Sequence, residues 1–235
     1  MIVWFLLAAS VAQAAPPEIT SALPRGGTRG EAYTLTLKGK NLDRPLGLTW
    51  YGPGIVTLGT ETVGEKKDRR IEARIRIEGD CRLGEHAFRV RTVQGFSDLM
   101  TFFVGALPDA AEAEPNNDPA QAQAIPLNVT VTGVVRNEDV DYFRIHAEKG
   151  QRISAELEGL RLGRQMFDPY LAILDTNRFE LAACDDSALL AQDPWISILA
   201  PETGDYVVEV RETAYRGSNQ AHYRLHLGTF ARPTA

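Results

Sequence analysis

Runs of alternating apolar and polar residues recur along the first half of the chain. Residues 70–77 are the clearest run, because Arg and Glu alternate there with Ile and Ala, and residues 32–39 and 85–93 repeat the pattern. Alternation with a period of two predicts strands that bury one face and expose the other to water. Shorter apolar runs between Gly and Pro turns predict further strands at residues 18–23, 46–51, 55–58 and 99–104.

The second half of the chain also predicts strands separated by turns. Turn signals lie at Gly150, Gly159, Gly204 and residues 217–219. Short strands at a spacing of roughly 8–12 residues are typical of β-sandwiches. The predicted fold class is therefore all-β, with two antiparallel β-sandwich domains in tandem, over residues 16–105 and 120–228. The strands expected in the second domain cover residues 129–135, 141–147, 152–157, 169–175, 195–200, 205–212 and 222–227.

Residues 106–119, between the two predicted domains, form an acidic linker. Its stretch 111–118 cannot be a core strand, because carboxylates recur at alternate positions and Pro115 lacks a backbone donor. Pro115 followed by Asn-Asn-Asp-Pro also excludes a stable helix. What the stretch offers is side-chain oxygen, from Glu112, Glu114, Asn116, Asn117 and Asp118.

A second group of oxygen-bearing side chains, residues 137–141, comes directly before the strand predicted at 142–145. It contains Asp139 and Asp141. Carboxylate and amide oxygens are the hard ligands that suit Ca²⁺. Where the two groups meet, a divalent cation would convert the repulsion between carboxylates into a tether between linker and sandwich. The charge pattern alone leaves open an ordinary solvated acidic linker with a turn at 137–141.

A further acidic group needs no metal to explain it. Its members lie beside strand ends or prolines, where Asp commonly caps turns: Asp168, Asp185, Asp186 and Asp193.

Composition and charge narrow the classes of partner and the location. The chain has 235 residues, a net charge of −6 and a pI near 5.3, which argue against a nucleic-acid partner. Residues 1–14 have a short apolar core and a small-x-small site at Ala12-Gln13-Ala14, and they predict a cleaved signal peptide. Its core is too short to span a bilayer, and we expect no membrane span after cleavage. The expected location is secreted, extracellular or cell-surface, with the periplasm as an alternative.

The motifs of common enzyme classes are absent from the sequence. None of the four histidines forms an HExxH motif, and neither a GxSxG motif nor a phosphate loop occurs. We therefore expect no enzymatic activity. The two cysteines, Cys81 and Cys184, do not form a disulfide framework, and their spacing does not decide whether they pair.

Several segments of the second half, in order, resemble the bacterial pre-peptidase C-terminal (PPC) domain. The resemblance covers about residues 111–228 and implies a secreted, jelly-roll-like β-sandwich of the kind appended to proteases and other large surface proteins. The first half resembles immunoglobulin-like modules of the IPT/TIG class, on residues 21–27 followed by 35–42. The segments that carry the PPC resemblance are 114–117 (Glu-Pro-Asn-Asn), Gly133, 139–143 (Asp-Val-Asp-Tyr-Phe), 149–151, 168–175, 185–186, 200–210 and 223–225.

The collagen-binding domains of bacterial collagenases are relatives of this family, and their acidic linker binds Ca²⁺. The resemblance places the linker pattern E-x-E-x-N-D on residues 112–117, with two later aspartates. Asn117 stands where the pattern has a carboxylate, which lowers the ligand charge and should weaken binding. The metal ligands that the resemblance implies are Glu112, Glu114, Asn116, Asn117, Asp139 and Asp141.

Three functions fit these observations. The first is a non-catalytic extracellular module, stabilised by Ca²⁺, that binds a protein or a cell-surface polymer. The second is the non-catalytic part of a larger secreted protease or adhesin, with residues 229–235 as a tail or a linker to a further domain. The third is a carbohydrate-binding module, which requires a row of exposed aromatic side chains; the candidates are Trp50, Tyr51, Trp195 and Tyr215.

Overall fold

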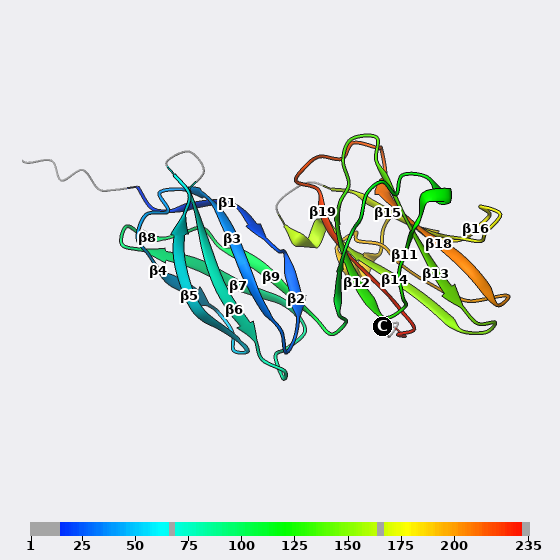
Figure 1. The fold of residues 1–235 in the computed structure, drawn as a ribbon, viewed down its shortest axis with the longest axis horizontal. Coiled ribbons are helices and arrows are strands. Elements are labelled where there is room, and N and C mark those ends of the chain that lie inside the picture. The colour runs from blue at the N-terminus through cyan, green and yellow to red at the C-terminus, as the bar shows by residue number, and fades with distance from the viewer. Residues whose placement is uncertain (1–14, 66–68, 164–166, 232–235) are drawn as a thin grey trace, which may run out of the picture.

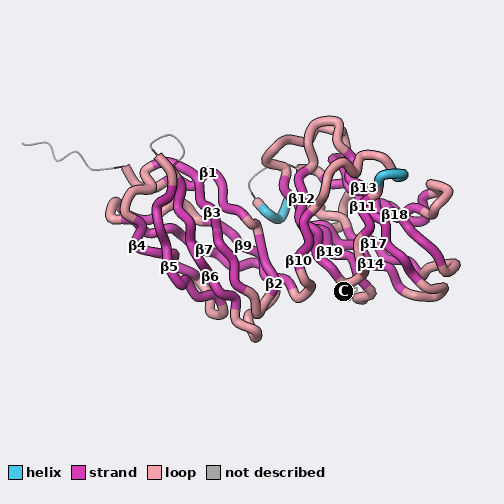
Figure 2. Tube along the Cα trace, in the orientation of Figure 1, coloured by secondary structure: helices cyan, strands magenta, loops and turns pink. Residues whose placement is uncertain are grey.

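The computed structural model describes residues 15–65, 69–163 and 167–231 of the chain. Strands dominate it, and they form two sandwiches that lie side by side (Figures 1 and 2). The prediction of an all-β chain with two β-sandwich domains in tandem is confirmed. The predicted signal peptide lies outside the described residues.

In its described residues, the first domain contains nine strands in two sheets. One sheet has the order β1-β3-β6-β5, and the other has the order β2-β9-β7-β4 with β8 paired to β7. The strands are β1 (Glu18–Leu23), β2 (Gly26–Thr28), β3 (Ala32–Lys40), β4 (Pro45–Trp50), β5 (Ile55–Val63), β6 (Arg70–Ile77), β7 (Gly84–Thr92), β8 (Gly95–Phe96) and β9 (Met100–Gly105).

The core of the first domain lies between the faces that the alternation predicts. On β6, Ile71, Ala73, Ile75 and Ile77 are all fully buried, and the intervening side chains face outward. Leu35, Leu37, Phe88, Val90 and Phe102 face them from β3, β7 and β9. The period-two pattern was therefore sufficient to orient these strands.

The described part of the second domain contains ten strands in two sheets, with the orders β10-β12-β19-β14-β17 and β11-β13-β18-β15-β16. The strands are β10 (Asp109–Ala111), β11 (Gln123–Ala124), β12 (Val129–Val134), β13 (Val140–Ala147), β14 (Arg152–Glu158), β15 (Pro169–Leu174), β16 (Glu180–Cys184), β17 (Trp195–Leu199), β18 (Gly204–Glu212) and β19 (His222–Gly228). Three 3₁₀ turns accompany them: η1 (Pro119–Gln121), η2 (Leu160–Leu162) and η3 (Ala188–Leu190).

The sheets are antiparallel except at three edges. The short strands β2, β10 and β11 pair in parallel with β9, β12 and β13, respectively. Strands β10 and β11 flank the acidic stretch, so part of the segment predicted as a linker belongs to the sheets of the second domain. This pairing fixes both ends of the acidic stretch against β12 and β13.

A buried arginine joins the two domains. Arg224 on β19 is 1% exposed, and its Nη1 lies 2.9 Å from Glu158 and its Nη2 3.5 Å from Asp109. Its guanidinium also lies against Gly26 of the first domain, where an added Cβ would approach Arg224 Cζ to 2.7 Å. From the first domain, Tyr33 donates a 2.6 Å hydrogen bond to Asp109.

Three further features concern membrane-spanning helices, the predicted C-terminal tail and the cysteines. The described part of the chain contains no helix with the length and apolar character needed to cross a membrane. The start of the predicted tail contacts the second domain, because Ser154 donates to the Phe230 carbonyl over 2.6 Å. Cys81 and Cys184 are both free.

Candidate metal centre

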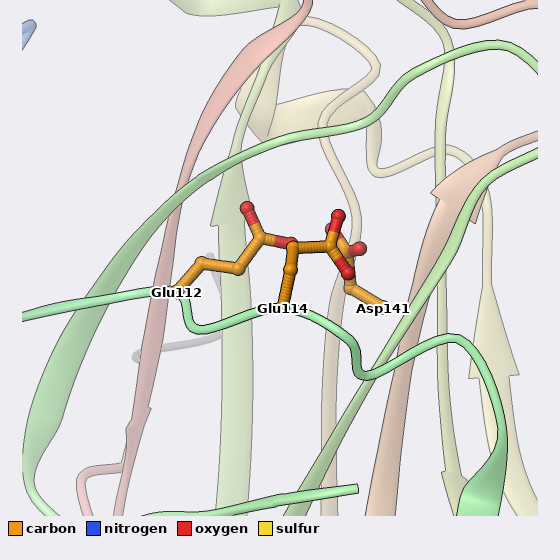
Figure 3. A group of neighbouring side chains, drawn as sticks. All are labelled: Glu112, Glu114 and Asp141. Atoms are coloured by element: carbon orange, nitrogen blue, oxygen red, sulfur yellow. The ribbon is translucent and has the colours of Figure 1, made fainter. Parts of the chain in front are cut away.

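Three carboxylates converge where the acidic stretch meets the second domain. Glu112, Glu114 and Asp141 each place one oxygen within 4.8 Å of the others. Figure 3 shows two of these side chains extending from the acidic stretch and the third from β13, all turned toward one another. Like charges at this separation repel strongly in a partly buried site, so a cation or a proton is needed to hold them together.

Backbone hydrogen bonds position the acidic stretch on the sandwich. The Glu112 amide donates to the Thr132 carbonyl of β12, and the Tyr142 amide of β13 donates to the Asn116 carbonyl, each over 3.0 Å. The stretch therefore crosses from one sheet to the other, and its side chains are held over the space between β12 and β13. This arrangement brings residues 112–116 to Asp141, which is distant in sequence.

Among the described residues, several buried oxygens at this point make no hydrogen bond of normal geometry, including the Tyr223 hydroxyl that faces Asp141. Asn116 and Asp141 are both fully buried. The Asn116 Oδ1 atom and both carboxylate oxygens of Asp141 have no hydrogen-bond partner of normal geometry. Buried acceptors without donors are rare and costly. An oxygen-seeking cation such as Ca²⁺ would satisfy all three, so the residues present fit the metal that the sequence predicts.

Burial and charge both act on Asp141. Burial, followed by the neighbouring Glu112, raises the pKa of Asp141 to about 9. The pKa of Tyr223, whose hydroxyl faces Asp141, is raised well above its usual value by burial and then by the Asp141 and Glu112 charges. Without a cation, the site therefore holds a proton at neutral pH. A bound divalent ion would replace that proton.

Gly133 makes room for the site. It lies opposite Tyr223 in the β12–β19 pair. A Cβ at Gly133 would lie 2.4 Å from the Tyr223 Oη and 2.7 Å from the Glu112 Oε2. The Glu112 Oε2 atom accepts a 3.0 Å hydrogen bond from the Val134 amide. A side chain at position 133 would therefore displace either the tyrosine or the carboxylate.

The structure brings some of the six predicted ligands together and leaves others out of the cluster. Glu112, Glu114 and Asp141 converge, and the Asn116 Nδ2 lies 3.5 Å from Glu112. Asp139 is buried beside them, but one of its oxygens accepts from the Arg136 amide over 2.9 Å. Asn117 is exposed, and in the described residues its side chain makes no hydrogen bond to the cluster.

Sequence reasoning missed two side chains at this site. In the sequence, Tyr223 was recognisable as part of a predicted strand and of a family segment but not as a site residue, and nothing marked Arg136. Arg136 Nη1 lies 2.8 Å from Glu114, so its positive charge already balances part of the negative charge that a bound cation would otherwise balance. Asp118, considered as a nearby oxygen donor, instead caps η1 by accepting from the Ala120 amide over 2.8 Å.

The other acidic group does not form a comparable site. Asp193 is fully buried and its carboxylate accepts from the Leu160 amide and the Arg161 Nε, each over 2.7 Å. Asp168, Asp185 and Asp186 are exposed. In the described part of the chain, Glu112, Glu114 and Asp141 form the one group of three or more such residues with ligand atoms this close.

The aromatic residues proposed for carbohydrate binding do not form a row. Trp50 is half-buried and packs against the first core, with ring centroids 4.7 Å from Phe88 and 6.0 Å from Phe102. Tyr51 and Tyr215 are 62% and 45% exposed, but they belong to different domains. Trp195 is half-buried on β17.

The family resemblance is confirmed for part of the second domain. Residues 139–212, which run from the start of β13 to the end of β18, match the family model of the bacterial pre-peptidase C-terminal domain. The matched segment is less than half of the chain, and it contains Asp139 and Asp141 but not the acidic stretch. No curated protein matches the sequence.

Solved structures give only distant likenesses. A glucan-utilisation protein, SGBP-B of Bacteroides ovatus, in complex with a mixed-linkage heptasaccharide, has 10% identity over 92% of this chain and 75% of its own, with a TM-score of 0.32. The secreted serine protease VesC of Vibrio cholerae has 12% identity and a TM-score of 0.30 over 87% of this chain, which spans 48% of VesC. Likenesses of this size establish neither function nor partner.

Proposed function

We propose that this chain is a non-catalytic, secreted or cell-surface accessory module, stabilised by Ca²⁺, which mediates contact with an extracellular protein or a surface polymer. The match to a pre-peptidase C-terminal domain supports the accessory role and the extracellular location. The observation that carries the metal is the set of buried, unpartnered oxygens on Asn116 and Asp141, beside the carboxylates of Glu112 and Glu114.

The cation would act as a clamp rather than as a catalyst. Glu112 and Glu114 belong to the acidic stretch, and Asp141 belongs to β13. A Ca²⁺ ion shared among them would fix the stretch to the second domain close to the domain junction at Asp109. The Glu114–Arg136 ion pair reduces the negative charge available, so we expect weaker binding than in a site whose carboxylates are unpaired.

Calorimetric titration with Ca²⁺, together with thermal melts in Ca²⁺ and in EDTA, tests this proposal. At about 100 times its dissociation constant, a cation that binds only the folded state adds about 2.7 kcal/mol of stability, which raises the melting temperature by a few degrees. We expect the shift in the wild type and its loss in Glu114→Gln and Asp141→Asn. Glu202→Gln, which removes an exposed carboxylate elsewhere, is the control and should keep the shift. Equal melts in Ca²⁺ and EDTA for the wild type would exclude the clamp.

A further inference from the structure

Strand β1 has a free edge on the side of the second domain. In its sheet the order is β1-β3-β6-β5, so β1 pairs with β3 alone. Figure 1 shows this strand on the side of the first domain that faces the second. The exposed edge of a sheet presents unpaired N–H and C=O groups that can template another strand.

A cleft between the domains meets this edge. The cleft has a volume of about 410 Å³, and four consecutive β1 residues, 20–23, line it. Alternate side chains of a strand point to opposite faces, so a wall made of consecutive residues is the edge of the strand and not one of its faces. Leu162 and Phe167 line the opposite side, together with His222 at the start of β19 and residues 219–220 of the turn before it.

The backbone at this edge is available over the second half of β1. Near its start, the Ile19 amide donates to the Asp98 Oδ1 over 3.1 Å, which closes that part of the edge. In the described residues, no backbone hydrogen bond beyond the pairing with β3 involves residues 20–23. The open part of the edge therefore coincides with the part that lines the cleft.

The charged and ionisable side chains of the cleft are all basic. Among the described residues, Arg25, Lys38 and His222 line it and neither Asp nor Glu does, although the chain as a whole is acidic. Arg25 is fixed there by donating to the Leu162 carbonyl. Lys38 makes no ion pair in the described chain, whereas Lys40, two residues along, lies 3.3 Å from Glu18. Burial, and then the Arg25 charge, lowers the pKa of His222, which favours its neutral imidazole, so Arg25 and Lys38 supply the positive charge of the cleft.

Neutral polar groups complete the wall opposite β1. Asn219 and Gln220, which are both exposed, line the cleft there. Such groups can bond to the outer edge of an added strand. Lys38 of β3 and His222 of β19 line the same cleft, so the side chains of that strand would meet basic groups.

We infer that the free edge of β1 binds an extended, acidic peptide segment of an extracellular partner as an added strand, with Lys38, Arg25 and His222 facing its carboxylates. The inference rests on the binding role proposed above and names its partner by chemistry. Main-chain hydrogen bonds to β1 would supply affinity, and charge complementarity would set specificity and raise the association rate. A second copy of this chain is a poor occupant, because its own β1 edge carries the same basic surroundings.

Fluorescence anisotropy with a labelled peptide of about six residues, in which glutamate and valine alternate, tests the inference. We expect saturable binding by the wild type and none with the matched lysine–valine peptide. N-methylation of alternate amides, which removes donors without changing charge, should weaken binding about tenfold or more. Lys38→Glu should weaken it by a similar factor, whereas Lys40→Glu, which changes an exposed lysine outside the cleft, should leave it unchanged.

Three results would overturn the inference. They are the absence of saturable binding at millimolar peptide, equal binding of the N-methylated peptide, and preferential binding of an acidic polysaccharide at the same Lys38-dependent site. Titrations in Ca²⁺ and in EDTA keep this test separate from that of the metal. A thermal shift without peptide binding rejects the added strand alone, and peptide binding without a thermal shift rejects the calcium clamp alone. Melts of both lysine variants verify that each is folded.

Discussion

Gly133 and Tyr223 lie directly opposite each other on β12 and β19, and the missing side chain of the glycine gives the tyrosine hydroxyl its place beside Asp141. The same gap admits the carboxylate of Glu112. One residue without a side chain therefore allows the acidic stretch and two strands to meet at the candidate metal centre.

Gly133→Ala should damage both stability and metal binding. The added methyl group would lie 2.4 Å from the Tyr223 Oη, so the ring or Glu112 must move. Overpacking of this kind costs about 1–3 kcal/mol, and displacement of Glu112 removes a ligand. Urea denaturation and Ca²⁺ titration measure the two effects. Gly204→Ala is the matched control, because a Cβ there meets nothing within 4 Å. Equal effects of the two substitutions would contradict the proposed role of Gly133.

Asn116 and Asn117 should differ in their effect on Ca²⁺ affinity, although both belong to the predicted ligand pattern. Asn116 is fully buried with an unpartnered Oδ1, whereas Asn117 is exposed. We expect Asn116→Ala to weaken Ca²⁺ binding at least tenfold and Asn117→Ala to leave it nearly unchanged. Each variant controls for the other in a calorimetric titration. Loss of affinity in Asn117→Ala alone would show that the acidic stretch binds metal in another conformation.

The pair between Arg224 and Glu158 should contribute strongly to stability at the domain junction. Arg224→Met leaves Glu158 as a buried charge without its guanidinium partner, and breaking a buried pair in this way costs about 3–5 kcal/mol. The double variant Arg224→Met/Glu158→Gln removes both charges, and we expect it to regain part of the loss. Urea denaturation of the single and double variants measures the coupling. A double variant no more stable than Arg224→Met would argue against a buried charge penalty.

Acid should weaken the same junction. Burial raises the pKa of Glu158, but the charges of His226 and Arg224 outweigh it and hold this pKa at about 2, below the ordinary value of 4.5. A depressed carboxyl pKa stabilises the fold fully above the unfolded value, and this stabilisation is lost as the pH falls from about 4.5 to about 2.

We therefore expect the free energies of unfolding of the wild type and Glu158→Gln to converge as the pH falls from about 6 to about 2. Denaturation curves measured across this range test it. Glu202→Gln, at an exposed position, is the control and should run parallel to the wild type. A constant difference between the wild type and Glu158→Gln across this range would show that Glu158 does not titrate as described.

Local patterns in the sequence were sufficient for the fold class and for most strands. A period of two places Ile71, Ala73, Ile75 and Ile77 on one face whatever the strand pairs with, because side chains of a strand always alternate. The candidate ligands were also readable as residue types, since Glu112, Glu114 and Asp141 carry the oxygens that suit Ca²⁺, and the metal itself stays a prediction. The match of residues 139–212 to a known family agrees with the order of the motifs.

Only the tertiary structure decided which oxygens share a site. Asn116 and Asn117 are adjacent and chemically identical, yet the hydrogen bond from the Tyr142 amide to the Asn116 carbonyl buries the first and leaves the second in solvent. Tyr223 reaches Asp141 because of a register between β12 and β19, and the free edge of β1 faces basic groups because a second domain lies beside it. These relationships depend on pairing between residues far apart in the chain, and local periodicity contains no information about them.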